Sequence, residues 1–583
     1  MRWVVGKPLF FYIIATLIII AIGQLPVVLH IFHTPEGAYY PYLDTLAPSD
    51  YYYPALIRYG MGPSWLLKIP YVIGQHQGSI IQIFFILLGK IALFSGLGPA
   101  EVFALSRVLG GIVFIAGVLY FLHQILPKEK AKWAFLFFLL AQPLPTIAGR
   151  FLNEDVGMWV WHFGEAARRV SSLPSHYSLG KGLAVLALGL FIHAVRTKRI
   201  KHALISSVVA FAAGMIYPPP VFMILFSLGV AGVVWSVITV ISRKRVIPNG
   251  VRNLSRLPWK FIRIFMGMRD SLKQVERSLS ASWRIGMTMG LFVLGSILPL
   301  LILRLELNKG YPWDMWQRVE LGWNDPSMRF EAHYIRQLGS ILFFIPFALI
   351  LVVKKRFISY MNIFTIVWAF SAFLLFPFAQ ALSLGKFRFT EGVQIIPLAV
   401  LAMQGFEFIK EQISERFETK KARIFVNAVI MILTVNFFFF TTLTALQNTK
   451  VLWGLRTNIY MPYSEREALA LLATSAPADS VVAADLYSSN FIPIFARVRT
   501  IIGFPDFFPS YKEFEKEHEI INALLQQKLT TEEVASYLRS RKVGFVYQKF
   551  LPKSHEPFYP TLFDPLFERS DVSVYQVKHE VLQ

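Results

Sequence analysis

The chain lacks cysteine altogether and is poor in charged residues. Without cysteine, the protein has no disulfide, no cysteine-ligated zinc and no thiol nucleophile. Charged residues make up only 16% of the 583 residues, whereas 55% are hydrophobic and the mean hydropathy is +0.50. A soluble protein of this size needs more polar residues to cover its surface. The composition therefore predicts a polytopic membrane protein.

Acidic residues are scarcer than basic ones, 36 against 58, which gives a formal net charge of +22. In a soluble protein such an excess would suggest nucleic acid as a partner. In a membrane protein it more simply reflects lysine and arginine held in cytoplasmic loops. We therefore expect the lipid bilayer as a partner and no nucleic acid.

Apolar runs recur along most of the chain, and about 20 residues span a bilayer core. Eleven runs are clear candidates: 9–32, 101–126, 132–148, 179–195, 202–217, 219–242, 283–303, 337–353, 357–378, 393–410 and 424–446. The run 80–98 is also apolar, but Lys90 at its centre favours a tilted or re-entrant piece buried against protein. The fold class predicted is an all-α polytopic membrane protein with about 11–13 transmembrane helices.

Basic clusters fall on alternate loops, at 127–132, 196–201, 243–273, 354–356 and 420–423. The positive-inside rule places these loops and the N-terminus in the cytoplasm. The intervening loops 33–80, 149–178, 304–336 and 379–392 then face outward. This pattern predicts a multi-pass protein of the cytoplasmic membrane.

The composition changes after residue 446, where polar and charged residues return. Short apolar runs at 480–485, 542–548 and 572–577 alternate with a helical pattern over 511–540. Short strands and helices in alternation are typical of an α/β domain. We expect a transmembrane domain over 1–446 and a small soluble extracytoplasmic α/β domain over 447–583.

Two of the predicted outer loops combine carboxylates with basic residues. The first contains "PSDYYYPALIRYGMGPSW" with Asp50 and Arg58, and the second contains "GRFLNEDVGMWVWHFGEAARR" with Arg150, Asp155 and His162. Their tyrosines and tryptophans are also what an interfacial aromatic belt would contain, and their charges could be only solvated. The recurrence of acids and bases on one face nevertheless indicates a site for chemistry.

A third outer loop, "LGKFRFTEG", places Lys386, Arg388 and Glu391 directly before an apolar run. An arginine fork is well suited to a phosphate group at the membrane surface. The alternative is a basic anchor that reaches into the interface without binding a substrate.

This order of features resembles the GT-C superfamily of integral-membrane glycosyltransferases, in particular its protein O-mannosyltransferase and aminoarabinose transferase branch. The resemblance rests on "ALIRYGMGPSW" after an early acid in the first outer loop, on "SGLGPAEVFALSRVLGG", and on a second outer loop with Arg150 and Asp155. It covers nearly the whole chain in organisation, and its motifs are short.

The resemblance implies a polyprenyl-phosphate-linked sugar as donor and a glycan, lipid or protein as acceptor. Asp50 matches the first acid of the family's Asp-Glu pair, the catalytic base, and the second position here is Tyr51. Asp155 matches the acid of the second outer loop, and Arg388 falls where a basic residue meets the lipid phosphate. Arg58, Arg150, His162, Lys386 and Glu391 are further candidates for substrate binding. No cofactor is expected, and a divalent metal is not supported.

Two alternatives remain at this stage. A transporter or lipid-handling protein could share the architecture without the reaction, and the triple proline at 218–220 would suit a broken helix along a substrate path. At the level of one residue, Asp50 could simply cap a helix that begins near Tyr52.

Overall fold

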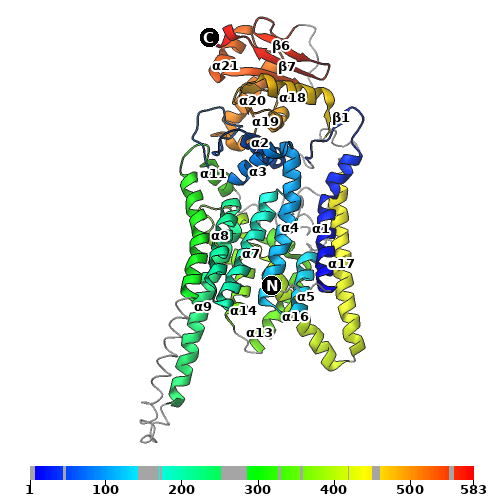
Figure 1. Ribbon diagram of the computed structural model, residues 1–583, viewed down its shortest axis with the longest axis vertical. Coiled ribbons are helices and arrows are strands. Elements are labelled where there is room, and N and C mark those ends of the chain that lie inside the picture. The colour runs from blue at the N-terminus through cyan, green and yellow to red at the C-terminus, as the bar shows by residue number, and fades with distance from the viewer. Residues whose placement is uncertain are drawn as a thin grey trace.

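The computed structural model describes residues 7–43, 48–141, 170, 174–250, 285–322, 324–325, 330–354, 359–417, 419–449, 460–549 and 557–583. It is elongated, with a long helical bundle at one end and a smaller region containing the C-terminus at the other (Figure 1).

The described part before residue 450 is mostly helical. Its elements are α1 (Lys7–Phe32), α2 (Pro48–Gly60), α3 (Ile83–Ser95), α4 (Pro99–Ile125), α5 (Lys128–Leu140), α7 (Ser175–Thr197), α8 (Ile200–Ile216), α9 (Pro218–Gly250), the helix Ile285–Leu307, α11 (Met315–Gly322), α12 (Phe330–Leu338), η5 (Gly339–Phe344), α13 (Ile345–Lys354), α14 (Tyr360–Leu375), η6 (Phe376–Phe378), α15 (Lys386–Thr390), α16 (Ile395–Arg416) and α17 (Thr419–Thr449).

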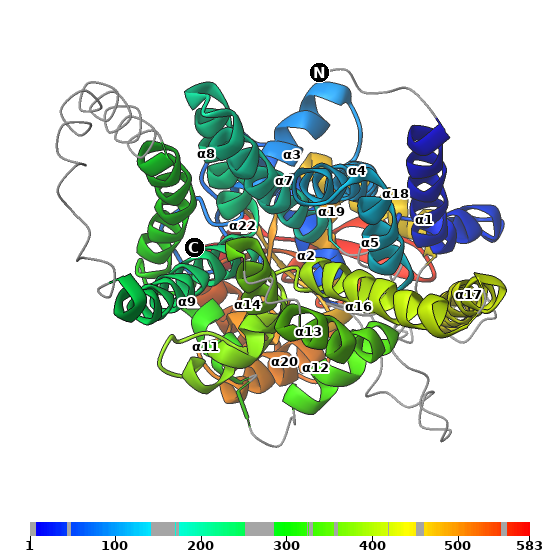
Figure 2. The ribbon, with the colours of Figure 1, turned by 90° about the horizontal axis from the view of Figure 1, so that it is seen from below.

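Most of the apolar runs coincide with one of these helices, whereas the run 337–353 is divided between η5 and α13, and residues 142–148 of the run 132–148 lie outside the described residues. The predicted mostly helical membrane fold is confirmed. Within the described residues, seven helices are long and apolar enough to cross a membrane: Leu9–Phe32, Pro99–Ile125, Ser175–Thr197, Pro218–Thr239, Ile285–Leu307, Tyr360–Phe378 and Lys420–Phe438. Along the bundle, α1 and α17 lie together at one edge and α9 at the opposite side (Figure 2).

The run 80–98 forms the short helix α3, whose 13 residues extend about 20 Å and cannot span a 30 Å hydrocarbon core alone. One face packs on α2, while Phe94 on the other is 96% exposed. The ammonium group of Lys90, the charged residue at the centre of this apolar run, donates hydrogen bonds to the carbonyl oxygens of Gly62 and Ser64. The charged side chain of Lys90 is therefore hydrogen-bonded to the backbone of the segment that follows α2.

Two glycines allow α2 and α3 to approach closely. A Cβ atom on Gly89 would lie 2.4 Å from the Ile57 carbonyl oxygen and 2.6 Å from the Gly60 Cα, both of them backbone atoms. Backbone atoms cannot rotate away as a flexible side chain can, so any larger residue here must separate the helices.

Gly89→Ala should therefore destabilise the protein by about 1–3 kcal/mol, the usual cost of overpacking a tight contact. The measurement is the midpoint of thermal unfolding of the detergent-solubilised protein. Gly229→Ala in α9 is the matched control, because a Cβ at Gly229 meets nothing within 4 Å. Equal midpoints for both variants would contradict the close packing of α2 on α3.

The C-terminal region contains a five-stranded mixed sheet in the order β4-β3-β5-β7-β6. Strands β3 and β4 are parallel, β3 and β5 are parallel, and β7 is antiparallel to both β5 and β6. The elements are β2 (Met461–Pro462), α18 (Tyr463–Ser475), β3 (Val481–Ala483), α19 (Leu486–Phe495), β4 (Arg499–Thr500), η9 (Pro505–Phe507), α20 (Tyr511–Leu525), α21 (Thr531–Arg541), β5 (Val543–Lys549), β6 (Phe563–Glu568), β7 (Val572–Val577) and α22 (His579–Leu582). The three strands expected from apolar runs are β3, β5 and β7.

The first predicted outer loop shares a hydrophobic core with this C-terminal region. Strand β1 (Ala38–Tyr39) pairs antiparallel with β2, and α2 packs against α19. Buried side chains of α2, α3 and the C-terminal sheet form one continuous cluster. The loop and the C-terminal region therefore form a single layer over one end of the bundle (Figure 1).

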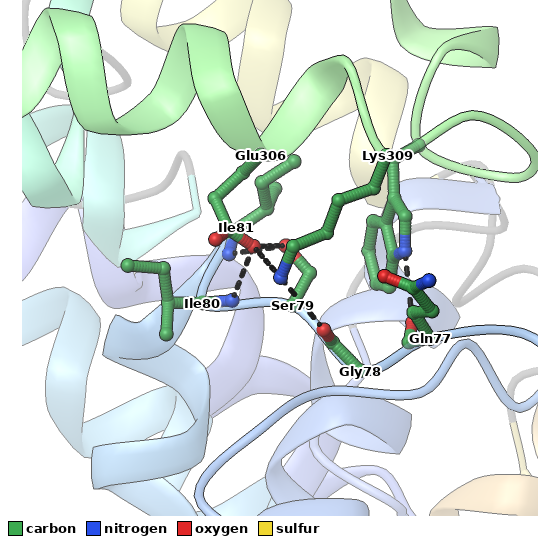
Figure 3. Close-up of polar contacts among 8 residues, drawn as sticks. Gln77, Gly78, Ser79, Ile80, Ile81, Glu306 and Lys309 are labelled. Carbon is green, nitrogen blue, oxygen red and sulfur yellow. Dashed lines mark hydrogen bonds and ion pairs between the residues drawn. The ribbon is translucent and has the colours of Figure 1, made fainter.

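A polar contact joins this layer to the helix Ile285–Leu307 (Figure 3). The Glu306 carboxylate accepts hydrogen bonds from the Ser79 hydroxyl at 2.6 Å and from the Ile80 amide at 3.1 Å, and it pairs with Lys309 at 2.7 Å. Lys309 also donates to the Gly78 carbonyl oxygen at 3.0 Å. These contacts fix the chain just before α3 against the bundle.

The orientation of the termini remains a prediction, which rests on the alternation of basic and non-basic loops. Reporter fusions after residues 260 and 460 should report opposite sides of the membrane, because the basic segment 243–273 is expected in the cytoplasm and the C-terminal region outside. Signals from the same side would overturn the topology.

Candidate functional site

The three consecutive tyrosines of α2 are buried, at 4–8% exposure, and each contacts a different part of the molecule. Tyr51 contacts Tyr487 of the C-terminal region, with ring centroids 6.4 Å apart. Tyr52 packs among other rings, including Phe504 and Phe507. Tyr53 points to the bundle. The cluster is thus an internal junction, and the alternative of an interfacial belt does not describe it.

Tyr53 reaches the start of α7. Its ring lies 4.8 Å from the His176 ring and 4.6 Å from the Phe85 ring. Burial raises the pKa of the Tyr53 hydroxyl well above its ordinary value, so the group keeps its proton at neutral pH. His176 is 8% exposed, and its Nδ1 atom has no hydrogen-bond partner within the described residues.

One turn further along α7 lies a buried cation, Lys181, which is 5% exposed. Its ammonium group lies 5.7 Å from the centre of the Tyr177 ring and 5.8 Å from that of Tyr217. An ammonium group buried in an apolar helix is costly unless aromatic faces or polar groups compensate for lost water, and such residues are commonly functional.

Tyr217 connects α7 to Arg388. It lies between α8 and α9, and its ring is 4.8 Å from that of Tyr177. The Arg388 Nη1 group donates to the Tyr217 hydroxyl at 3.5 Å. Segments separated by more than 150 residues therefore converge on one polar cluster.

Arg388 lies in α15 and pairs with two carboxylates. Its Nε and Nη2 atoms are each 2.9 Å from Oε1 of Glu320, at the end of α11. Its Nη1 atom is 3.2 Å from Oε2 of Glu391, whose side chain is fully buried. A buried carboxylate needs such a partner, because an unpaired charge out of water is strongly disfavoured.

Lys386 has different partners from Arg388. Its ammonium group pairs with Glu331 of α12 at 2.7 Å, and its backbone amide donates to the Asn324 side chain at 2.8 Å. Burial alone would raise the pKa of Glu331, but the hydrogen bond from Lys386 lowers it below the ordinary value. Lys386 therefore ties α15 to α12, beside the cluster around Arg388.

Of the residues singled out in the sequence, the structure brings together Arg388 and Glu391. Asp50 belongs to α2, one turn before Tyr53. Arg58, on the same helix, is half-buried, and its Nη1 atom lies 3.7 Å from the sulfur of Met61. The second-loop candidates Arg150, Asp155 and His162 lie outside the described residues.

The alternative that Asp50 caps a helix beginning near Tyr52 is wrong about where the helix begins. α2 begins at Pro48 rather than near Tyr52, so Asp50 lies within the first turn and does not precede it. A carboxylate in the first turn of a helix interacts favourably with the helix dipole, an effect of about 0.3–1 kcal/mol.

Four members of the cluster were not predicted: His176, Lys181, Tyr217 and Glu320. Lys181 could have been identified from the sequence, because a charged residue inside an apolar run such as 179–195 indicates a functional site. Glu320 carried none, since its loop contains several acids. Within the described part of the chain, no group of three histidine, aspartate or glutamate side chains could hold a metal ion.

The protein combines an apolar helical bundle, a polar cluster at one end of that bundle and a layer containing a mixed sheet over the same end. This is the fold of the GT-C integral-membrane glycosyltransferases, which confirms the predicted resemblance at the level of the fold. The chain is similar to AglB, the oligosaccharyltransferase of Archaeoglobus fulgidus, in complex with an inhibitory peptide and a dolichol-phosphate: TM-score 0.50 and 14% identity, over 93% of this chain and 69% of that one.

A second similar structure is ArnT from Cupriavidus metallidurans bound to undecaprenyl phosphate. It has a TM-score of 0.45 and 11% identity, over 99% of each chain. No protein-family model and no curated protein matches the chain. At these identities the likeness establishes the fold alone.

Proposed function

We propose that the protein is a glycosyltransferase that moves a sugar from a polyprenyl-phosphate donor to an acceptor at the outer face of the membrane. The observation that carries the proposal is a polar cluster at the covered end of an apolar bundle, in which Lys181, His176 and Glu391 are buried and Arg388 and Glu320 are partly buried. A lipid phosphate is a ligand whose tail suits the bundle and whose head suits such a cluster. The AglB structure of the same fold contains a dolichol-phosphate.

In this proposal the two cations receive the phosphate. Lys181 and Arg388 carry two positive charges, against two negative charges on Glu320 and Glu391, so the cluster is balanced without a ligand. An arriving phosphate would compete with the carboxylates for Arg388, whose guanidinium can bind two oxygen atoms at once. The Nδ1 atom of His176, which has no hydrogen-bond partner among the described residues, is a further group to which a ligand oxygen could hydrogen-bond.

The reaction itself needs a base and a stabilised leaving group. Asp50 would accept the proton of the acceptor hydroxyl as its oxygen bonds to the anomeric carbon. The bond from that carbon to the donor phosphate breaks, and the electron pair leaves with polyprenyl phosphate. Arg388 and Lys181 would stabilise the charge on that phosphate. Asp155 would orient the acceptor, and Lys386 would hold α15 in place.

The test is a transfer assay with purified protein and a polyprenyl-phosphate sugar labelled in the sugar. We expect label in an acceptor fraction from the cell envelope and an equal amount of free polyprenyl phosphate. Binding of the donor without release of polyprenyl phosphate, whichever acceptor fraction is added, would contradict the enzyme and favour a lipid-handling protein.

A further inference from the structure

A polar pocket lies away from the Arg388 cluster, between the first predicted outer loop and the C-terminal region. Its volume is about 560 Å³, and it shares no residue with the cluster. Its side-chain lining consists of Lys68, Gln75, His76, Gln77, Asp479 and Arg499. Lys68, Gln75 and Gln77 are exposed, so the pocket opens to solvent.

Arg499 joins the two walls of this pocket. Its Nη1 atom donates to the Ile73 carbonyl oxygen at 2.8 Å, on the loop side, and its Nε atom donates to the Asp479 carbonyl oxygen at 3.0 Å, on the C-terminal side. The Thr500 amide also crosses, donating to the Pro70 carbonyl oxygen at 3.0 Å. Arginine has five N–H donors, so the fixed guanidinium still presents donors to the pocket.

His76 holds the loop wall in shape. Its Nε2 atom accepts a hydrogen bond from the Ile69 amide, and its Nδ1 atom lies 3.0 Å from the Gly74 carbonyl oxygen, to which it donates. Burial lowers the pKa of His76; Lys68 and Arg499 add to this, whereas the Gly74 carbonyl oxygen and Asp479 oppose it. The imidazole is therefore neutral at pH 7, as its acceptor role at Nε2 requires.

The same loop is fixed from the bundle side. The Trp313 indole donates to the Gln77 carbonyl oxygen at 2.9 Å, and Lys309 and Glu306 hold Gly78 and Ser79 (Figure 3). With its backbone fixed from three directions, the pocket is pre-organised, which reduces the entropy lost when a ligand binds.

The free groups of the pocket define the chemistry of its ligand. Lys68 makes no hydrogen bond or ion pair within the described residues, and Lys68 and Arg499 bring two positive charges to the pocket against one negative charge on Asp479. The amides of Gln75 and Gln77 and the Asp479 carboxylate supply donors and acceptors suited to hydroxyl groups. Apart from the His76 imidazole, no aromatic or large aliphatic side chain is among the described residues that line the pocket.

We propose that this pocket binds an anionic saccharide, with the acidic group at Lys68 and Arg499 and the sugar hydroxyls at Gln75, Gln77 and Asp479. The assignment does not depend on the reaction at the Arg388 cluster. A carboxylated sugar and a phosphorylated sugar share this chemistry.

The test measures binding to purified detergent-solubilised protein by calorimetric titration, using trigalacturonate, galactose 6-phosphate, neutral galactotriose and inorganic phosphate. We expect at least one anionic sugar to bind about tenfold more tightly than both galactotriose and inorganic phosphate. Which one it is identifies the acidic group as carboxylate or phosphate.

Two variants locate the site. Lys68→Gln should weaken binding of the anionic sugar roughly five- to tenfold, the loss expected for one partly exposed charge-assisted hydrogen bond. Lys516→Gln, an exposed change on α20, is the matched control and should leave affinity unchanged. Equal affinity for inorganic phosphate and the anionic sugars, no binding of either sugar, or an unaltered affinity in Lys68→Gln would each overturn the proposal.

Discussion

Asp50→Asn should lower the rate of sugar transfer by roughly a hundredfold or more while donor binding persists. The amide keeps the shape and hydrogen-bonding capacity of the carboxylate but cannot take up the acceptor's proton. The measurement is turnover of a labelled polyprenyl-phosphate sugar, alongside donor affinity, in protein whose folding has been verified.

The control for Asp50→Asn is Glu513→Gln, which removes a first-turn carboxylate from α20. Each change removes a favourable interaction between a carboxylate and the helix dipole, which is worth about 0.3–1 kcal/mol, so both variants should fold. If Asp50→Asn turned over like the wild type, Asp50 would be a stabilising first-turn residue, and the base would have to be sought elsewhere.

Arg388→Ala is expected to have the second large effect, and it should appear in donor binding as well as turnover. Loss of a charge-assisted phosphate partner is worth about 1.5–3 kcal/mol, which corresponds to roughly 10- to 150-fold in affinity. The change also leaves Glu391 buried without its guanidinium partner, so we expect stability to fall by about 3–5 kcal/mol.

A double variant separates the two consequences. Adding Glu391→Gln to Arg388→Ala removes the unpaired buried charge and should recover much of the stability without recovering donor affinity. Lys130→Ala serves as the surface comparison, because Lys130 and its partner Glu407 are 46% and 25% exposed and such pairs contribute little. Recovery of donor affinity in the double variant would mean that Arg388 only maintains the fold.

The sequence predicted the helices well because the bilayer requires long apolar segments, and a run such as 101–126 is readable without any tertiary information. Strands β3, β5 and β7 were predictable for a similar reason, since short apolar runs between polar segments form buried strands. The short helix α3 was harder, because its apolar composition resembles a span and only Lys90 and its 13-residue length distinguish it.

The candidate site was predictable only in part. Arg388 and Glu391 were found because they interrupt an apolar pattern at a loop. Their partner Glu320 is 68 residues from Arg388, and no local pattern relates two residues at that separation. Tyr217 is one of 23 tyrosines, and its position before a triple proline carries no functional signal. Its role depends on how α7, α9 and α15 pack together, and this packing cannot be read from a single sequence.

The shared core of the first loop and the C-terminal region has a consequence for how the chain is made. Strand β1 can pair only after β2, more than 420 residues later, has been synthesised, and Tyr51 of α2 can pack on Tyr487 only once α19 is complete. Contacts between such distant segments form late and leave apolar surface exposed in the meantime. A ribosome that stalls or terminates before residue 460 would therefore release an inserted bundle whose outer tyrosines and leucines remain uncovered, a form that quality-control proteases and chaperones recognise.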